Sequence, residues 1–411
     1  MRESHDVRVV LSTYGSRGDV EPLAGLAVQL RALGARVRVC APPDEEFAAR
    51  LAEAGVEVVP VGQSVRSLVT GPRPAPTDFP RRAAVLVEQF HEAVLAAAEP
   101  GGAVVATGLF PAVAGAQAAA EKLGAHFAYV ALQPTMLPSP HHPPFEYPMR
   151  PYPAEVTDNR ELWALNIEAM NALFGEAVNG HRAAVGLPVA ENVRDHVFTD
   201  RPWLATDPTL GPWLLPADRE VVHTGAWILP DDRPLPADLE AFLTAGEAPV
   251  YVGFGSMPLH DAAATARAAV DAVRAQGRRV LLGRGWARLA EADGAADCFA
   301  VDEVNQQALF PRVAAVVHHG GAGTTTTAAR AGVPQVLVPQ IVDQPYWAAR
   351  VAALGIGVAH DGPTPTADSL SAALRQALTP GIAERAAAVA GGIRDDGAAV
   401  AAKLLLEAAA G

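Results

Sequence analysis

A glycine-rich turn between a valine-rich run and an alanine-rich segment is the feature that most constrains how this chain can fold. The run covers residues 313–317, residues 318–325 read HHGGAGTT, and a helical pattern follows over residues 326–331. This order predicts a strand, a tight turn and a helix N-terminus. Small residues let a ligand approach the backbone, and the N–H groups and dipole at a helix N-terminus attract phosphate.

A tight turn that binds nothing is the alternative interpretation of this stretch. The two histidines before the glycines and the two threonines after them favour a ligand. We therefore predict that this turn holds the diphosphate of a nucleotide.

The same strand–turn–helix order recurs in both halves of the chain. Strand patterns are expected at 7–11, 37–39, 56–61, 103–107, 127–132 and, as the last of the first half, 203–205. In the second half they are expected at 250–256, 279–282, 299–301, 313–317, 335–338 and 356–359. Helical patterns between them predict parallel sheets with right-handed crossovers. The fold class is therefore α/β, with two doubly wound Rossmann-like domains facing each other across a deep cleft.

A Pro- and Asp-rich stretch separates the two halves, as a domain connection does. The expected organisation is a first domain over residues 1–206, a linker over 207–235 and a second domain over 236–390. A C-terminal helix within residues 391–411 is expected to pack back on the first domain.

Composition excludes several function classes. With 411 residues, 50% hydrophobic and 19% charged, the chain is globular and long enough for two or three domains. A net charge of −13 argues against a general nucleic-acid or anionic-membrane binder. The two cysteines, Cys40 and Cys298, suggest neither a disulfide framework nor a metal site. No signal peptide or membrane-spanning run is evident, so we expect a cytoplasmic monomer.

Several polar residues follow the expected strands, at the sheet edge where ligands bind in such folds. Asp19 can act as a general base, although its spacing alone favours a carboxylate that stabilises a helix N-terminus. Residues 253–256, with Gly255 and Ser256, can flank one diphosphate together with the His319 turn. Trp286 can stack on a base or belong to the core.

Two further stretches have open interpretations. Asp343 and Gln344 carry the acceptors and donors that hold sugar hydroxyls, although Asp343 also suits a helix N-cap. Residues 133–157 interleave prolines with aromatic side chains, which suits a wall for a bulky, flat substrate or a surface linker.

Taken together, these motifs resemble the nucleotide-sugar-dependent glycosyltransferases of the two-Rossmann-domain (GT-B) type. The likeness covers nearly the whole chain and is strongest to the enzymes that glycosylate antibiotics of the vancomycin and teicoplanin group. It rests on residues 15–22 (GSRGDVEP), 224–230 (TGAWILP), 252–256 (VGFGS), 318–325 (HHGGAGTT), 343–346 (DQPY) and 357–363 (GVAHDGP).

The resemblance implies a role for each matching residue. The first domain would bind the acceptor, with Asp19 as the base and Ser16 assisting it, and the second would bind the nucleotide sugar. Ser16 stands where related plant and macrolide enzymes have a histidine, which leaves Asp19 as the evident proton acceptor. The remaining roles would be diphosphate binding by Gly255, Ser256, His319, Gly321, Gly323 and Thr324, sugar binding by Asp343 and Gln344, and nucleoside binding by Val304 and Gln306, with Trp286 beside them.

The implied activity is transfer of a sugar with inversion from a nucleotide diphosphate donor, UDP-glucose or a TDP-deoxysugar, to a hydroxyl of a glycopeptide aglycone. No cofactor and no protein-held metal is expected, because the nucleotide sugar is a co-substrate. A polyketide or macrolide acceptor is the alternative within the same chemistry. A nucleotide-sugar epimerase on the same scaffold is the alternative from another enzyme class, and it would need additional acids or bases.

Overall fold

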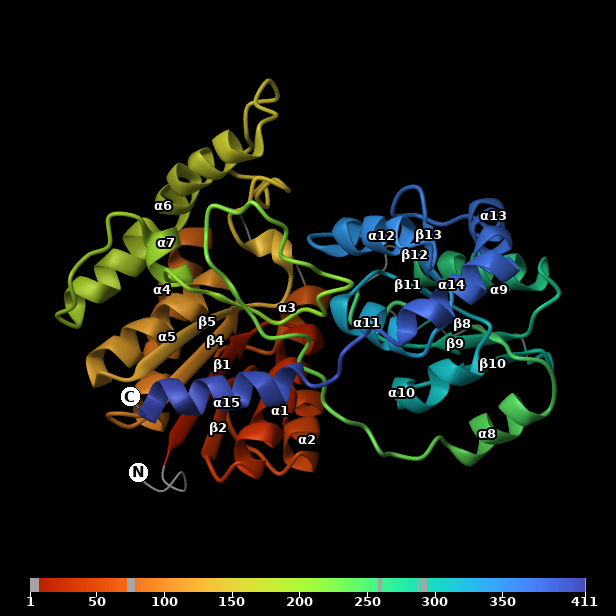
Figure 1. The fold of residues 1–411 in the computed structure, drawn as a ribbon, viewed down its shortest axis with the longest axis horizontal. Coiled ribbons are helices and arrows are strands. Elements are labelled where there is room, and N and C mark those ends of the chain that lie inside the picture. The colour runs from red at the N-terminus through yellow and green to blue at the C-terminus, as the bar shows by residue number, and fades with distance from the viewer. Residues whose placement is uncertain (1–6, 72–77, 258–260, 287–288, 290–293, 411) are drawn as a thin grey trace. The chain divides into compact units, whose positions relative to one another are not determined.

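The computed structural model describes residues 7–71, 78–257, 261–286, 289 and 294–410, and its contacts divide the chain into two compact units (Figure 1). Unit 1 consists of Met1–Pro208, Pro212–Leu229 and Arg394–Gly411. Unit 2 consists of Thr209–Gly211 and Pro230–Ile393. The expected connecting stretch, residues 207–235, is therefore shared between the two units rather than standing apart from them.

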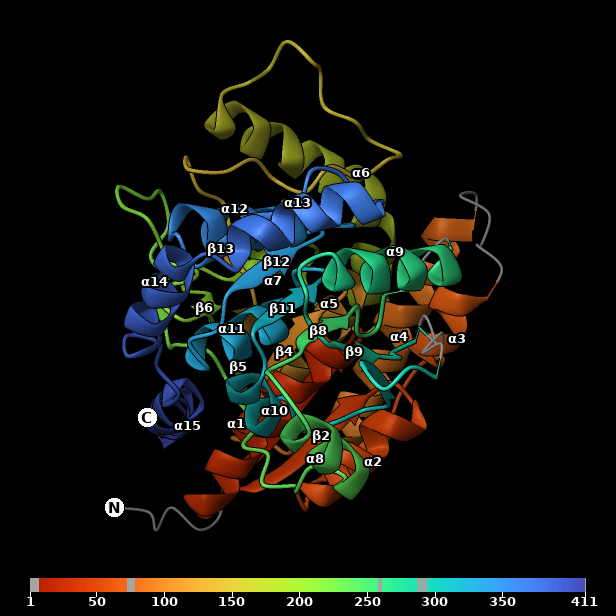
Figure 2. The ribbon, with the colours of Figure 1, turned by 90° about the vertical axis from the view of Figure 1, so that its right-hand side faces the viewer.

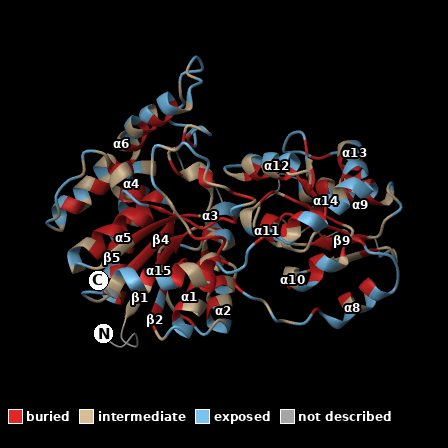
Figure 3. Ribbon diagram, in the orientation of Figure 1, coloured by how far each residue is buried: buried red, intermediate tan, exposed pale blue. Residues whose placement is uncertain are grey.

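Unit 1 is built on a seven-stranded sheet in the order β3-β2-β1-β4-β5-β6-β7, whose neighbours pair in parallel. The inner strands β1 and β4 are buried along nearly their whole length because both faces are covered (Figure 3). The strands are β1 Arg8–Tyr14, β2 Arg36–Ala41, β3 Glu57–Pro60, β4 Ala103–Gly108, β5 His126–Ala131, β6 Trp203–Leu204 and β7 Val222–His223.

The helices of unit 1 pack on this sheet and on one another. Helix α1 contacts β1 and β2 and carries α15 along its side, whereas α4 and α5 pack tightly together. Their bounds are α1 Arg17–Ala32, α2 Glu45–Glu53, α3 Val65–Thr70, α4 Phe79–Ala97, α5 Phe110–Leu123, η3 Pro134–Met136, α6 Asn159–Ala184, α7 Val193–Phe198 and α15 Gly397–Ala410.

The C-terminal helix α15 is fastened to unit 1 at its beginning. The Arg394 backbone N–H donates to Asp207 Oδ2 at 2.8 Å. Gly397 lies directly against the backbone of Gly225, and a side chain on Gly397 would overlap it. The glycine pair therefore sets how closely α15 approaches this part of unit 1.

Unit 2 has a six-stranded parallel sheet in the order β10-β9-β8-β11-β12-β13. Alternate side chains of each strand enter cores on opposite faces, as the two-residue period of a strand requires. Val250 and Val252 pack beneath α9 and α13, which lie side by side in Figure 2, while Tyr251 packs toward α8 and α10.

The elements of unit 2 follow the alternation expected from the sequence. The strands are β8 Val250–Gly253, β9 Val280–Gly283, β10 Cys298–Val301, β11 Ala315–His318, β12 Gln335–Leu337 and β13 Gly357–Ala359. The helices are α8 Ala237–Thr244, α9 Ala262–Arg274, α10 Gln306–Leu309, η4 Phe310–Arg312, α11 Ala322–Arg330, α12 Gln344–Ala353, α13 Ala367–Ala377 and α14 Pro380–Ala390.

Both sheets reverse their strand order at one point, between β1 and β4 in unit 1 and between β8 and β11 in unit 2. In open α/β sheets this reversal opens a crevice at the carboxyl ends of the strands, where ligands bind. Helix α1, whose first turn carries Asp19, follows β1, and the HHGGAGTT stretch begins at the last residue of β11. The prediction of two parallel-sheet, Rossmann-like domains is confirmed.

Two details of the sequence prediction are wrong. The strand at residues 203–204 is not the last of unit 1, because β7 pairs beside it; two residues are too short to produce a recognisable pattern. The pattern over residues 383–406 also predicts one continuous helix, but the structure has two, α14 and α15, separated at Gly391 and Gly392. Within the described ranges no helix combines the length and hydropathy needed to cross a bilayer.

A buried histidine of α4, His91, packs against a half-buried histidine of α6, His181. The rings of His91 and His181 are 4.5 Å apart and nearly perpendicular, and neither His91 Nδ1 nor His181 Nε2 has a hydrogen-bond partner among the described residues. Burial lowers the pKa of His91 to about 4, and the neighbouring His181 and Lys122 act in the same direction. Burial also lowers the pKa of His181, against the influence of Glu88 and Glu92.

This pair should make the stability of unit 1 sensitive to acid. Between the ordinary pKa of 6.5 and about 4, the unfolded chain binds a proton at residue 91 that the folded chain does not. The free energy of unfolding should therefore fall as pH drops through this window, by on the order of 3 kcal/mol for His91. His91→Gln is neutral at every pH, so its denaturation midpoint should lose less than wild type between pH 7 and pH 4.5.

The exposed Gln89 of the same helix provides the control, since Gln89→Ala removes no titratable group and should retain the wild-type pH dependence. Equal pH dependence in wild type and His91→Gln would show that His91 does not couple folding to protonation.

Candidate nucleotide-sugar site

Three turns meet at the carboxyl edge of the unit 2 sheet, after the adjacent strands β9, β8 and β11. The turn after β8 carries Gly255 and Ser256, and the turn after β9 carries Trp286. The Trp286 backbone N–H donates to the Gly255 carbonyl at 2.9 Å, which ties these two turns together. The structure thus brings together stretches that the sequence separates by about thirty and sixty residues.

The His319 ring fills the space between two glycines of this edge. A Cβ on Gly255 would lie 3.3 Å from His319 Cε1, and a Cβ on Gly321 would lie 2.5 Å from its Nε2. Gly255 also has a φ of +54°, which favours glycine. The glycines around His319 therefore allow the close approach of an imidazole ring to two backbone segments.

The two adjacent histidines have different roles. His318 is fully buried; its Nδ1 accepts from the Gly320 N–H at 3.1 Å, and its Nε2 therefore donates to Gln335 Oε1 at 3.0 Å. Burial lowers the pKa of His318 to about 3, so the ring is neutral. Because the ring is buried and both of its nitrogens are hydrogen-bonded within the protein, His318 stabilises the turn and does not bind the ligand.

His319 is only partly buried, and its Nδ1 is enclosed without a hydrogen-bond partner in the described part of the chain. Burial lowers the pKa of His319 to about 4. Near neutral pH the ring is therefore uncharged and has one N–H to donate. It can stabilise a phosphate oxygen by a hydrogen bond but not as a cation.

Helix α11 begins at this edge with Gly321 as its N-cap, a residue that has no side chain to satisfy the first N–H groups. Thr325, Thr326 and Thr327 each donate their hydroxyl to the carbonyl four residues earlier. Among the described residues, the Thr324 hydroxyl in the first turn makes no such bond. The helix therefore begins with open N–H groups and a hydroxyl, the arrangement that binds phosphate.

Asp343 and Gln344 lie at the beginning of α12, after β12. Asp343 occupies the N-cap position, but its side chain does not cap the helix; its Oδ2 accepts from the Trp347 indole N–H at 2.7 Å. Burial raises the pKa of Asp343 to about 6, and the Trp347 hydrogen bond opposes part of this shift. Gln344 is buried, and its Oε1 accepts from the backbone N–H groups of residues 340 and 341.

The three residues expected near the nucleoside differ in accessibility. Trp286 is half-buried beside Gly255, and Gln306 is half-buried at the first position of α10. Val304 is 7% exposed and packs with Leu309 and Phe310 in the core. The Val304 side chain therefore has little surface for contact with a nucleotide base, which leaves only its backbone for such a contact.

In unit 1, Ser16 and Asp19 begin α1 at the carboxyl end of β1. The Ser16 backbone N–H donates to Asp19 Oδ2 at 2.8 Å, in a capping box. A side chain on Gly15 would overlap the Asp19 carboxylate. The carboxylate thus folds back over the turn because residue 15 is glycine, and it performs the capping role that its spacing favoured.

The Pro- and aromatic-rich residues 133–157 are fastened along α6. The Trp163 indole N–H donates to the His142 carbonyl at 2.9 Å, and Asn166 Nδ2 donates to the Tyr152 hydroxyl at 2.9 Å. Tyr152 in turn donates to the Phe145 carbonyl at 3.2 Å. Phe145 and Met149 remain more than a third exposed, so the segment presents apolar surface from an anchored backbone.

Two supporting residues were missed by the sequence analysis. Trp347 binds Asp343 from one helical turn further along, a spacing of four that the sequence displays. Met257 accepts a hydrogen bond from Gln344 Nε2 to its Sδ at 3.4 Å. No local sequence signal predicts this second contact, because the two residues are 87 positions apart.

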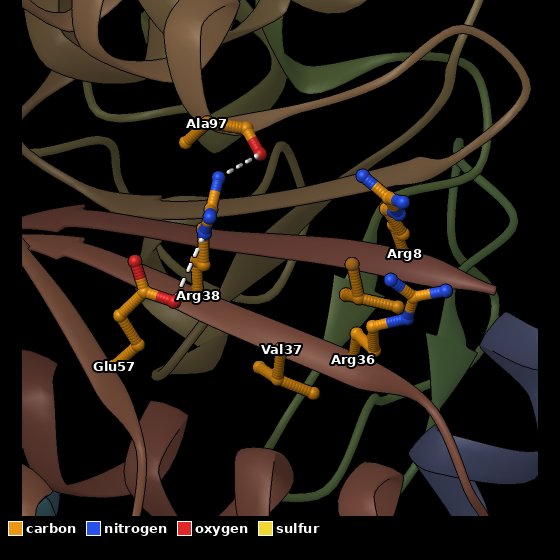
Figure 4. A pocket seen from close by; sticks show the side chains of 7 residues that line it. Arg8, Arg36, Val37, Arg38, Glu57 and Ala97 are labelled. Atoms are coloured by element: carbon orange, nitrogen blue, oxygen red, sulfur yellow. Dashed lines mark hydrogen bonds and ion pairs between the residues drawn. The ribbon is translucent and has the colours of Figure 1, made fainter. Parts of the chain in front are cut away.

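At the opposite edge of the unit 1 sheet, Arg8, Arg36 and Arg38 line a hollow near the amino ends of β1 and β2 (Figure 4). Arg38 pairs with Glu57 at 3.1 Å, and Arg8 pairs with Glu99. This pairing leaves little net charge for an anion, so we assign no ligand there. In the described ranges no cluster of three or more His, Cys, Asp or Glu residues could hold a metal ion.

Comparison with known proteins agrees with this geometry. Residues 9–128 match the family model of the glycosyltransferase family 28 N-terminal domain. Residues 295–402 match the model of the erythromycin biosynthesis protein CIII-like C-terminal domain.

Curated relatives match over nearly the whole chain. The vancomycin aglycone glucosyltransferase of Amycolatopsis orientalis is 54% identical over 98% of both chains. The dTDP-epi-vancosaminyltransferase of the same organism is 50% identical over 93% of both chains. Among solved structures, the glycosyltransferase of kitacinnamycin shares the fold with a TM-score of 0.73 and 23% identity, covering 98% of this chain and 99% of that one. The chain therefore belongs to the nucleotide-sugar-dependent glycosyltransferases with two Rossmann-like domains, the family that its motifs resemble.

Proposed function

We propose that this enzyme transfers a hexose, with inversion, from a uridine or thymidine diphosphate sugar to a hydroxyl of a glycopeptide aglycone. The observation that carries the proposal is the edge of unit 2 where His319, the open N-terminus of α11 and the β8 turn meet. The name of one relative specifies a vancomycin aglycone as the acceptor, and the name of the other specifies a dTDP-linked sugar as the donor. These names support a glycopeptide acceptor and a nucleotide-sugar donor.

The donor half of the reaction follows from the chemistry of this edge. As the bond between the anomeric carbon and the diphosphate breaks, negative charge grows on the leaving diphosphate. The N–H groups of the first turn of α11, the Thr324 hydroxyl and the neutral His319 ring donate hydrogen bonds to it. Fixed donors of this kind stabilise developing charge at no reorganisation cost.

The acceptor half of the reaction is assigned to Asp19. The acceptor hydroxyl attacks the anomeric carbon and gives its proton to the Asp19 carboxylate, while the bond to the diphosphate breaks. The Ser16 N–H holds the carboxylate through Oδ2. The apolar surface of Phe145 and Met149 suits the aromatic rings of a heptapeptide aglycone.

The substrates themselves can be tested directly. The protein would be incubated with vancomycin aglycone and UDP-glucose or a TDP-deoxysugar, and the product read by mass. An increase by one sugar on the glycopeptide is the expected result. Sugar transfer to a macrolide but not to the glycopeptide would replace the proposed acceptor, and interconversion of the donor without transfer would indicate an epimerase.

Asp19→Asn should separate proton transfer from helix capping. Asparagine keeps a carbonyl oxygen that accepts from the Ser16 N–H, but it cannot take a proton. We expect kcat to fall at least about 100-fold, with the donor KM and the unfolding temperature nearly unchanged. Glu21→Gln, which changes a carboxylate of the same helix, should retain wild-type kcat. A near-normal kcat for Asp19→Asn would leave Asp19 with the capping role alone.

Gly321→Ala should weaken nucleotide binding by displacing the His319 ring. Its Cβ would lie 2.5 Å from His319 Nε2, so the ring has to move. We expect the affinity for UDP or TDP, measured by calorimetry, to drop by about tenfold, equivalent to about 1.4 kcal/mol. Gly381→Ala, where a Cβ meets nothing within 4 Å, is the matched control. An unchanged affinity in Gly321→Ala would remove His319 from the diphosphate site.

We further propose that transfer needs no protein-held metal or other cofactor. The charge of the leaving diphosphate is met by the α11 N-terminus and His319 instead. Turnover should therefore persist in EDTA at a saturating donor concentration. Loss of turnover that Mg²⁺ restores would contradict this part of the proposal.

A further inference from the structure

Leu109 joins β4 to α5 at the point where the unit 1 sheet reverses its strand order. Its backbone N–H donates to the carbonyl of Tyr14, the last residue of β1, at 3.0 Å. Gly108 makes this approach possible, because its φ is +93° and a Cβ there would lie 2.7 Å from the same carbonyl oxygen. Leu109 is therefore held at the switch point, where open α/β sheets bind their ligands.

The turn that Leu109 contacts also carries the candidate base. Tyr14 is followed by Gly15, and the Asp19 carboxylate lies so close to Gly15 that a side chain there would overlap it. The Ser16 N–H holds this carboxylate from the same turn. Leu109 and Asp19 thus contact adjacent residues of one turn, and a group that reaches the carboxylate comes close to residue 109.

A leucine at this position contributes little to the fold. Residue 109 is the N-cap of α5, where Ser, Thr, Asp or Asn would accept a hydrogen bond from the first turn and leucine cannot. Its side chain is not buried either: Leu109 is 52% exposed, whereas the next residue, Phe110, is 7% exposed. A residue that supplies neither a cap nor a core contact departs from local preference, and such departures are expected at functional sites.

Exposed apolar side chains continue from this switch point along the same edge of the sheet. Phe145 and Met149 lie in the segment after β5, the neighbour of β4, and residues 214–215 lie in the segment after β6, the next strand. These two segments are joined, because His141 Nε2 donates to the Pro216 carbonyl at 3.0 Å. Three neighbouring strands are thus each followed by exposed apolar surface, at the end of the sheet that carries the candidate base. Apolar surface gathered in this way indicates a binding site.

We propose that Leu109 determines acceptor specificity: its side chain packs against the ring that carries the reacting hydroxyl and so selects which hydroxyl reaches Asp19. A phenolic ring suits this contact, because it buries a large apolar area and carries its polar group at the rim. The apolar segments after β5 and β6 extend the same surface to the remainder of a bulky aglycone. The inference rests on the proposed function, which assigns the base to Asp19.

Leu109→Ser separates acceptor contact from stability, because the two should not fall together. Serine removes the apolar contact but can accept a hydrogen bond as the N-cap of α5. We expect kcat/KM for vancomycin aglycone to fall by about tenfold, the order expected for the loss of one leucine contact. The donor KM should stay within about twofold of wild type. The unfolding temperature should be at or above the wild-type value, which a merely structural role of Leu109 would not produce.

Two further variants provide the matched comparisons. Leu109→Met keeps an apolar side chain of similar volume, so its kcat/KM for the aglycone should stay within about threefold of wild type. Leu33→Ser changes another exposed leucine, which follows α1 at the end opposite to Asp19. This variant should retain wild-type acceptor kinetics.

Wild-type kcat/KM for the aglycone in Leu109→Ser would overturn the proposal, because the side chain would then not contact the acceptor. A loss of donor and acceptor kinetics together with a lower unfolding temperature would also overturn it, in favour of a structural role. If wild type glycosylates a macrolide and not the glycopeptide, the proposed acceptor fails, and the same series on the macrolide still tests Leu109. If wild type transfers sugar to neither, both the proposed function and this inference fail.

Discussion

The donor edge of unit 2 depends on the room that two glycines make for one imidazole ring. Gly255 and Gly321 flank His319 so closely that neither position has space for a side chain without moving the ring. The ring in turn lies beside the N-terminus of α11, whose N-cap Gly321 has no side chain to satisfy the first N–H groups of the helix. The hydrogen bond from the Trp286 N–H to the Gly255 carbonyl connects the turn after β8 with the turn after β9.

His318 and His319 are adjacent in sequence but differ in burial, and therefore differ in the contacts that each ring can make. His318 points into the interior and uses both nitrogens to fix Gly320 and Gln335, whereas His319 is partly accessible and has an enclosed nitrogen without a partner among the described residues. Both have lowered pKa values, so neither supplies positive charge near neutral pH. In the proposed reaction, the His319 ring would therefore stabilise charge only as a neutral hydrogen-bond donor, together with the N–H groups of α11.

The sequence predicted the architecture and the family better than the packing of individual side chains. Alternating strand and helix patterns, each joined by a glycine turn, were sufficient for both parallel sheets, because continuous apolar runs have few other solutions. The burial of the Val304 side chain and the contact of Gln344 with Met257 could not be predicted. Each depends on how distant segments pack, and a single sequence carries no local signal for such packing.

A common principle connects the turns after β1, β11 and β12, three of those that carry candidate site residues. In each turn, one side chain fixes the backbone: His318 accepts from Gly320, Asp19 from Ser16, and Gln344 from Gln340 and Ile341. Because these bonds form before any ligand arrives, the sites are preorganised, and little ordering cost is left for binding. The same bonds mean that truncating such a residue changes the turn as well as the contact. For these positions, isosteric variants and double-mutant cycles separate chemistry from positioning, whereas alanine substitutions combine the two.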